Sequence, residues 1–219
     1  MKFVSGSLFI KSLVVVILLL PTLRVMAGSE SIVYQNECMG CHVGQTKDGG
    51  VIVNELRGPP LGGLGKQYIL RQLKGFKYGW RGAGHPAARS MSDAIANYSD
   101  EELKEISHWA ANIQSDKHFD YSLGKGSDGY QLYSDKCKGC HDSVIGRYMT
   151  ESPKINYLDT DYIIRQLHFF DEGSRNFDQP TKHQLKMQTV IKSLTDDEFE
   201  VLTRFIASAS LNKDEGTDE

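Results

Sequence analysis

All four cysteines of the chain fall in two short motifs of the same form, each with a histidine directly after it. The motifs are Cys38-Met39-Gly40-Cys41-His42 and Cys137-Lys138-Gly139-Cys140-His141. Two thiols three positions apart lie on one side of a helical turn. There they can bond the two vinyl groups at one edge of a porphyrin, and the histidine can bind its iron. Cys-x-x-Cys-His is the attachment signature of c-type haem, so we predict two covalently bound haem c groups.

Disulfides, a zinc site or a thioredoxin-like redox motif are the alternative uses of four cysteines. None of these requires a histidine directly after each pair. The two pairs also lie 99 residues apart, much farther than in a zinc ribbon. We therefore favour haem attachment through the four cysteines, with His42 and His141 as the proximal iron ligands.

A methionine follows each motif at a similar distance. Met91 lies 49 residues after His42, and Met187 lies 46 residues after His141. A thioether is a soft ligand that favours ferrous iron, and Met/His pairs bind the iron of cytochromes c. We expect Met91 and Met187 to be the second axial ligands, with core packing as the alternative.

Two histidines compete with these methionines for the same position. His85 lies six residues before Met91, and His183 lies four residues before Met187. Because the two spacings differ, these histidines do not align with each other across the two halves of the chain. They remain alternatives that would give a haem with two histidine ligands and a lower reduction potential.

An internal repeat positions these residues. Val33-Tyr34-Gln35-Asn36-Glu37-Cys38 aligns with Leu132-Tyr133-Ser134-Asp135-Lys136-Cys137, and Tyr68-Ile69-Leu70-Arg71-Gln72-Leu73 aligns with Tyr162-Ile163-Ile164-Arg165-Gln166-Leu167. The second match continues from Phe76, Gly79 and Arg81 to Phe170, Gly173 and Arg175. Apolar residues spaced by three and four predict an amphipathic helix in each half, with Gly79 or Gly173 just beyond its end.

A third repeated block predicts the last helix of each half. Met91 precedes Ser99-Asp100-Glu101-Glu102, and Met187 precedes Thr195-Asp196-Asp197-Glu198. A hydroxyl followed three residues later by a carboxylate is a capping box, which satisfies free amides of the first helical turn. We expect these helices to run through Ile113 and through Ala209.

No segment alternates apolar and polar residues for long enough to predict a sheet, so we expect an all-α protein with two domains. The predicted divisions are an N-terminal domain at 28–114, a linker at 115–128, a C-terminal domain at 129–211 and a polar tail at 212–219. Domains this small build marginal cores alone. A bound macrocycle would supply part of each interior.

The first 27 residues have the pattern of a secretory signal peptide. A positively charged start is followed by the apolar run Leu13–Leu20, and Val25-Met26-Ala27 offers small residues for cleavage after Ala27. Only 12 residues separate Lys11 from Arg24, whereas a membrane span needs about 20. Removing the segment takes the formal charge from −3 to −6. An acidic mature chain without a membrane span argues against a nucleic-acid partner and fits one with a basic docking patch.

These motifs together resemble the di-haem cytochrome c4 family, in which two class I cytochrome c domains follow one another. The resemblance covers most of 31–209. It implies two helical domains related by a pseudo-twofold axis, with haem propionates facing the interface. It also implies that the carbonyl of Pro59 (or Pro60) accepts a hydrogen bond from His42, and that of Pro153 from His141. Arg81 and Arg175 recur in register and are candidates for pairing with propionates, with a solvated helix face as the alternative.

The same resemblance implies a periplasmic electron carrier without enzymatic activity. It would pass single electrons from a respiratory donor to a terminal oxidase or reductase. An alternative is an electron-accepting subunit of a periplasmic dehydrogenase that oxidises a sulfur compound or an alcohol. A di-haem peroxidase fits less well, because it needs a vacant iron position and both halves carry a methionine. The repeat is imperfect where Gly75 and Trp80 correspond to Phe169 and Ser174, so the two haems are expected to differ in exposure and potential.

Overall fold

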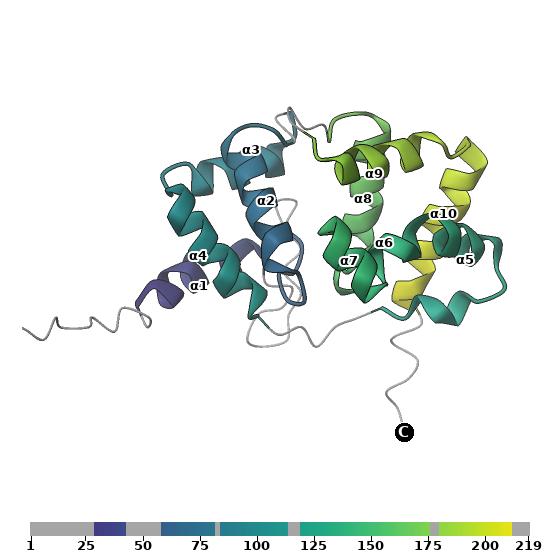
Figure 1. Cartoon of the computed structure of the whole chain (residues 1–219), viewed down its shortest axis with the longest axis horizontal. Coiled ribbons are helices and arrows are strands. Elements are labelled where there is room, and N and C mark those ends of the chain that lie inside the picture. Colours follow the sequence, from purple (N-terminus) through teal and green to yellow (C-terminus); the bar gives the residue numbers. More distant parts are fainter. Residues whose placement is uncertain (1–28, 43–57, 82–83, 114–118, 176–179, 212–219) are drawn as a thin grey trace, which may run out of the picture.

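The computed structural model describes residues 29–42, 58–81, 84–113, 119–175 and 180–211. All regular structure within these ranges is helical, which confirms the predicted fold class. Figure 1 shows two groups of helices side by side, with α1 to α4 in one and α5 to α10 in the other. The predicted signal peptide, its cleavage site after Ala27 and the polar tail at 212–219 lie outside the described residues.

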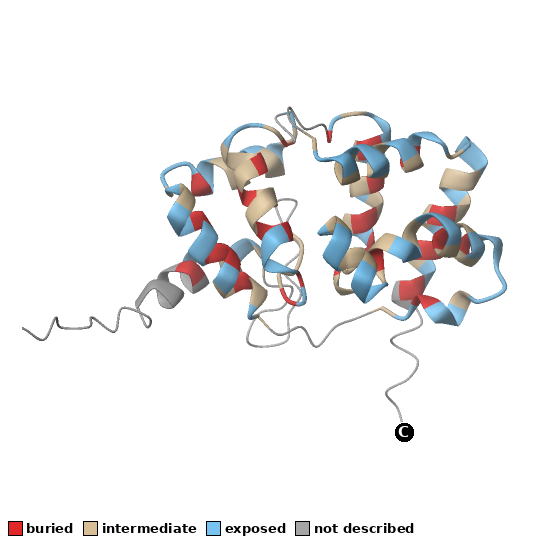
Figure 2. Ribbon diagram, viewed as in Figure 1, coloured by how far each residue is buried: buried red, intermediate tan, exposed pale blue. Residues whose placement is uncertain are grey.

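The first group forms around α2, which packs against both α3 and α4. Its apolar stripe buries Ile69 and Leu73, and α4 contributes Leu103 and Ile106 to the same core. Figure 2 colours the buried positions of these helices red. The helix bounds are α1 (Ser29–His42), α2 (Lys66–Lys77), α3 (Pro86–Ile95) and α4 (Asp100–Ala111).

The second group repeats this plan around α8, which packs against α9 and α10. Leu167, Leu202 and Ile206 are buried at the centre of this group. The segment that corresponds to α1 is broken here into an α-helix, a π-helical turn and a short α-helix. The bounds are α5 (Asp128–Tyr133), η2 (Ser134–Lys138), α6 (Gly139–His141), α7 (Val144–Thr150), η3 (Ile155–Tyr157), α8 (Thr160–Asp171), α9 (Lys182–Lys192) and α10 (Asp196–Leu211).

The helix ends follow the local sequence as predicted. Ser99 and Glu102 form the capping box of α4, and Thr195 and Glu198 exchange the equivalent two bonds before α10 at 2.9 and 3.2 Å. Each cap stabilises its helix by about 1 kcal/mol. Gly79 and Gly173 adopt φ of 71° and 76° two residues after the ends of α2 and α8, a conformation that glycine adopts without strain.

The interval predicted as a linker is structured in its second half. A 3-10 helix, η1 (Tyr121–Gly124), packs against α10. The Tyr121 ring is buried and lies 4.9 Å from Tyr133 and 5.9 Å from Phe205, measured between ring centroids. This part of the interval therefore contributes to the core of the second group.

The two predicted methionine ligands precede the capped helices, as predicted, but each lies inside a helix of its own. Met91 is in the middle of α3, and Met187 is at the matching place in α9. Proline at the first position of α3 and a Thr181–Gln184 capping box at α9 start these two helices. Within the part of the chain that the structure describes, no helix has the length and apolar character to cross a membrane.

Candidate functional site

The four cysteines lie where the motif-bearing helices end. Cys38 and Cys41 are in the last turn of α1, Cys137 is in the π-helical turn and Cys140 is in α6. None of the four is in a disulfide. Burial raises the pKa of Cys38 to about 11 and that of Cys137 to about 12. Both are therefore protonated near neutral pH, unlike the low-pKa thiolates of reactive or redox cysteines.

Each motif histidine is held by one backbone carbonyl. His42 Nδ1 lies 2.8 Å from the Pro59 oxygen, and His141 Nδ1 lies 2.9 Å from the Pro153 oxygen. Because a carbonyl oxygen can only accept, Nδ1 carries the proton in both rings and Nε2 keeps its lone pair. Burial lowers the pKa of both histidines, which keeps the rings neutral. Each imidazole therefore presents a metal-binding nitrogen whose orientation is fixed by its second nitrogen.

A mainly apolar cavity opens beside each histidine. The space beside the first histidine is about 1550 Å³ and that beside the second about 870 Å³, each figure including a part that is open to solvent. The first is lined by Cys38, Cys41, His42, Pro59 and Met91. The second is lined by Cys137, His141, Pro153 and Met187. Among the predicted cysteines, only Cys140 does not line its cavity.

The competing histidines also line the cavities, His85 the first and His183 the second. His85 has a second role, because its Nδ1 accepts a bond from Ala87 N at 3.2 Å and so caps α3. Its ring also lies 5.0 Å from that of Phe169 in the opposite group. The ligand choice between Met91 and His85, and between Met187 and His183, stays a prediction.

Arg81 and Arg175 lie between the two cavities. They are 8% and 7% exposed, so the alternative of a solvated helix face is wrong for both. Each guanidinium stacks on an aromatic ring of its own group at 4.5 Å, Arg81 on Phe76 and Arg175 on Phe170. Burial and the positive charge of Arg81 lower the pKa of Arg175, although a guanidinium stays charged near neutral pH.

The buried Nε of Arg175 lacks a hydrogen-bond partner. Among the described residues, neither Arg81 nor Arg175 forms an ion pair with a carboxylate. An unpaired buried donor on an uncompensated cation calls for an acceptor with negative charge. The residues present thus fit a flat apolar group with acidic substituents, attached at the cysteines and bound by histidine.

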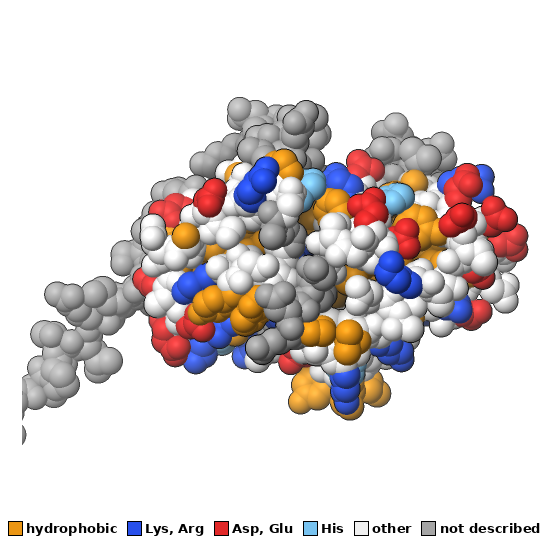
Figure 3. Space-filling view, turned by 90° about the horizontal axis from the view of Figure 1, so that it is seen from above, with side chains coloured by type: hydrophobic (Ala, Val, Ile, Leu, Met, Phe, Trp, Pro, Cys, Tyr) orange, Lys and Arg blue, Asp and Glu red, His pale blue; other side chains and the backbone are white. Residues whose placement is uncertain are grey.

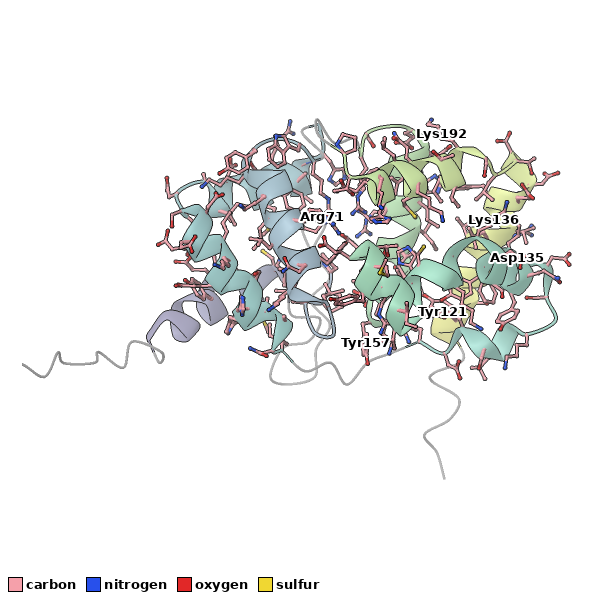
Figure 4. The ribbon with its side chains drawn as sticks, in the orientation of Figure 1. Arg71, Tyr121, Asp135, Lys136, Tyr157 and Lys192 are labelled. Atoms are coloured by element: carbon pink, nitrogen blue, oxygen red, sulfur yellow. The ribbon has the colours of Figure 1, made fainter. Side chains whose placement is uncertain are left out.

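Some functional residues were not predicted as such. Gln72 and Gln166 belong to the repeated Tyr-Ile-x-Arg-Gln-Leu segments, and both line both cavities. Arg71 belongs to the same repeated segment, and its Nη1 lies 2.5 Å from Glu151 Oε2 of the second group. Figure 4 shows Arg71 directed from α2 toward that group. Recurrence in register was the only clue to these roles in the sequence.

Comparison with known proteins places these sites in a family context. No family model matches the chain. It is 26% identical over 160 residues to a cytochrome c4 of Pseudomonas aeruginosa, covering 68% of this chain and 74% of the relative. It is 28% identical over 162 residues to a cytochrome c4 of Stutzerimonas stutzeri, covering 68% and 75%. These similarities confirm the predicted resemblance.

Solved structures give the same result for the fold. A reduced cytochrome c4 from Pseudomonas stutzeri superposes with a TM-score of 0.57 at 25% identity, covering 80% of this chain and 96% of that structure. The cytochrome c4 of Acidithiobacillus ferrooxidans gives a TM-score of 0.55 at 20% identity, covering 80% and 99%. The chain therefore has the fold of these cytochromes. Its similarity to cytochrome c4 proteins also supports the predicted cofactor, two covalently bound haem c groups.

Proposed function

From its similarity in sequence and fold to the cytochrome c4 family, we propose that this chain is a periplasmic carrier of single electrons with one haem c in each domain. The observation that carries the proposal is the repeated cavity. In each group of helices, motif cysteines (Cys38 and Cys41 in the first, Cys137 in the second), a neutral histidine with a free Nε2 and a methionine come together around an apolar space. Haem supplies an iron that gains and loses one electron reversibly.

The protein side chains have separate roles toward this group. The cysteines Cys38, Cys41, Cys137 and Cys140 would form the thioether bonds. His42 and His141 would bind the iron through Nε2, while the Pro59 and Pro153 carbonyls hold the Nδ1 protons at 2.8 and 2.9 Å. Met91 and Met187 would supply sulfur on the opposite side. Arg81 and Arg175 would offer charge and hydrogen bonds to acidic substituents of the porphyrin.

Two protein ligands at each iron favour electron transfer over substrate chemistry. If Met91 and Met187 bind the irons as His42 and His141 would, no position would remain at either iron for oxygen or peroxide. The mainly apolar lining would surround the bound group with few polar atoms. We accordingly assign no catalytic residue, and we retain 28–114 and 129–211 as the two electron-carrying domains.

The proposed partners are a respiratory donor and a terminal oxidase or reductase. Support for an exported location comes from the predicted signal peptide at 1–27. Figure 3 shows Asp and Glu side chains interspersed with Lys and Arg on the face seen from above. A protein surface of mixed charge suits brief docking to another protein, because steering and release both depend on exposed charges.

A redox titration of the purified holoprotein, followed by visible absorption, tests the proposal. We expect two one-electron steps, a mass increase equal to two haems, and a methionine-to-iron charge-transfer band in the oxidised form. A colourless protein, or a mass with no added haem, would rule the proposal out.

A further inference from the structure

The two cavities share one wall. Of the residues that line each cavity, six line both, and they come from α2 and α8 or from the segments that follow η3 and α8. A single layer of side chains therefore separates the two sites. The shared residues are Tyr68, Gln72, Leu158, Tyr162, Gln166 and Arg175.

Four polar side chains form a closed ring in this wall. Gln72 Oε1 accepts from Arg81 Nη1 at 2.6 Å and from Arg175 Nη2 at 3.3 Å. Gln166 Oε1 accepts from Arg175 Nη1 at 2.7 Å and from Arg81 Nη2 at 3.0 Å. Each glutamine oxygen thus binds both arginines, one from its own domain and one from the other. We call these four residues the Gln–Arg ring.

The ring holds two positive charges close together in a buried place. Repulsion between the two guanidinium groups would drive them apart, because charges interact strongly where water is excluded. Each glutamine amide places the negative end of its C=O dipole between the two guanidinium groups and fixes the orientation of both guanidinium planes. If either glutamine lost its oxygen, both arginines would lose a partner, including the arginine of the opposite domain.

The position of these arginines matters for reduction. A nearby cation stabilises the state with one more electron, so it raises the potential of a redox centre. Arg175 lines both cavities, whereas Arg81 lines the first. The charge of Arg175 is consequently felt on both sides of the wall.

We propose that Gln72 and Gln166 are positioning residues that set the reduction potential of the haem in the opposite domain as well as in their own. They act through Arg81 and Arg175 and touch no iron ligand. This inference rests on the proposed function, since it requires a haem in each cavity. It adds a device by which one site influences the other through protein side chains.

The test is a redox titration of the holoprotein carrying Gln72→Leu, with the two haems distinguished by repeating it in a Met187→His background. Leucine keeps the approximate volume but removes the acceptor. We expect the N-terminal potential to fall by the equivalent of about a tenfold change in the reduction equilibrium, which is ~59 mV for one electron. We expect the C-terminal potential to fall as well, by the equivalent of at least a threefold change in the reduction equilibrium. This shift is smaller because the bond from Arg175 to Gln72, at 3.3 Å, is longer than the bond from Arg81, at 2.6 Å.

Gln166→Leu is the matched variant and should show the reverse order of effects. Gln131→Leu is the control, because Gln131 is an exposed glutamine of α5 that lines neither cavity. It should leave both potentials unchanged. If Gln72→Leu gives no folded holoprotein, Gln72→Asn, which draws the oxygen back by one methylene, decides the question with the same readout.

The outcomes separate this inference from the proposed function. Wild-type protein without two haems overturns both. Wild-type protein with two haems, together with a Gln72 variant that shifts only the N-terminal potential, overturns the inference and leaves the electron carrier intact. A merely structural role for Gln72 would lower stability without moving the C-terminal potential.

Discussion

The two domains hold their motif histidines in the same way, in different surroundings. His42 and Pro59 are separated by 17 residues in sequence and His141 and Pro153 by 12, yet the Nδ1–oxygen distances are 2.8 and 2.9 Å. The loops have diverged in length while the contact has not. The difference teaches that the position of the ring is set by its carbonyl partner and the helix end, not by the path of the chain between them.

The surroundings of the two motif histidines differ more than their hydrogen bonds do. The first cavity is the larger, and its histidine ring is crowded by Gly58, where a Cβ would lie 2.3 Å from His42 Cε1. Ser152 precedes the proline in the second domain, so a side chain fits at the corresponding place. The ring of His85 lies 5.0 Å from that of Phe169 in the other domain. The residue that corresponds to Phe169 is Gly75, which has no ring that could make the reciprocal contact. We therefore expect two distinct potentials.

The largest expected effect comes from breaking one haem attachment. Cys137→Ala should leave the C-terminal domain unable to fold, because a domain of this size has a marginal core without its macrocycle. Amide NMR spectra should show dispersed signals from the N-terminal domain only, and Cys38→Ala should give the reverse. A C-terminal domain with sharp, dispersed amide signals in the absence of its haem would contradict this view.

Replacing Met187, the proposed iron ligand of the C-terminal domain, should shift the reduction potential of that domain alone. Met187→His replaces a thioether by a stronger ligand of ferric iron, so the C-terminal potential should fall by on the order of 0.1 V, within the wide range that axial ligands span. The N-terminal potential should stay nearly constant. Spectroelectrochemical titration measures both potentials. If both shifted equally, or if neither shifted, Met187 would not be the ligand.

The crowding at His42 can be tested by exchanging residues between the domains. Gly58→Ser introduces a Cβ against the imidazole ring, and such overpacking costs about 1–3 kcal/mol. The N-terminal domain should lose stability in denaturant titrations, and its haem spectrum should change. The reciprocal Ser152→Gly should have little effect. If Gly58→Ser and Ser152→Gly changed domain stability equally little, the proposed difference in crowding between His42 and His141 would be contradicted.

The smallest effect concerns an ion pair found in one domain. Asp100 bonds Lys74 Nζ at 2.7 Å and thereby links α4 to α2. Hydrogen bonds from Lys74 and Tyr78 lower the pKa of Asp100 to about 2. Because this pKa is depressed, its contribution to stability is present above the ordinary carboxyl pKa near 4 and is lost as pH falls toward 2.

Asp100→Asn should therefore remove a small, salt-sensitive part of the acid dependence of unfolding, because exposed pairs contribute little. Asp196, at the corresponding position of α10, forms no ion pair among the described residues and serves as the matched control. Thermal unfolding at pH 2 to 7 measures both variants. An identical pH profile for Asp100→Asn and wild type would show that the pair is without effect.

Much of the fold could be predicted because its determinants are local. A few neighbouring residues determine each of these features: the capping boxes before α4 and α10, the left-handed glycines after α2 and α8, and the two histidine motifs. The helical placement of Met91 and Met187 was missed, although Ala87, Met91 and Ile95 recur at the four-residue spacing of a helix in α3.

The interface could not be predicted from one sequence, since its partners are far apart along the chain. Arg175 and Gln72 are 103 residues apart, and Arg81 and Gln166 are 85 apart. The exposed apolar side chains of α7, among them Ile145 and Tyr148 at 75% and 84% exposure, also escaped prediction. Their exposure depends on how α7 packs against α6, where Gly146 meets the Gly139 backbone.

Carbon monoxide binding to the reduced holoprotein tests the central claim most directly. If a histidine and a methionine hold each iron, the visible spectrum of the folded protein should not change when the gas is added. The pairs are His42 with Met91 and His141 with Met187. Stoichiometric carbon monoxide binding at either haem, without unfolding, would contradict the account.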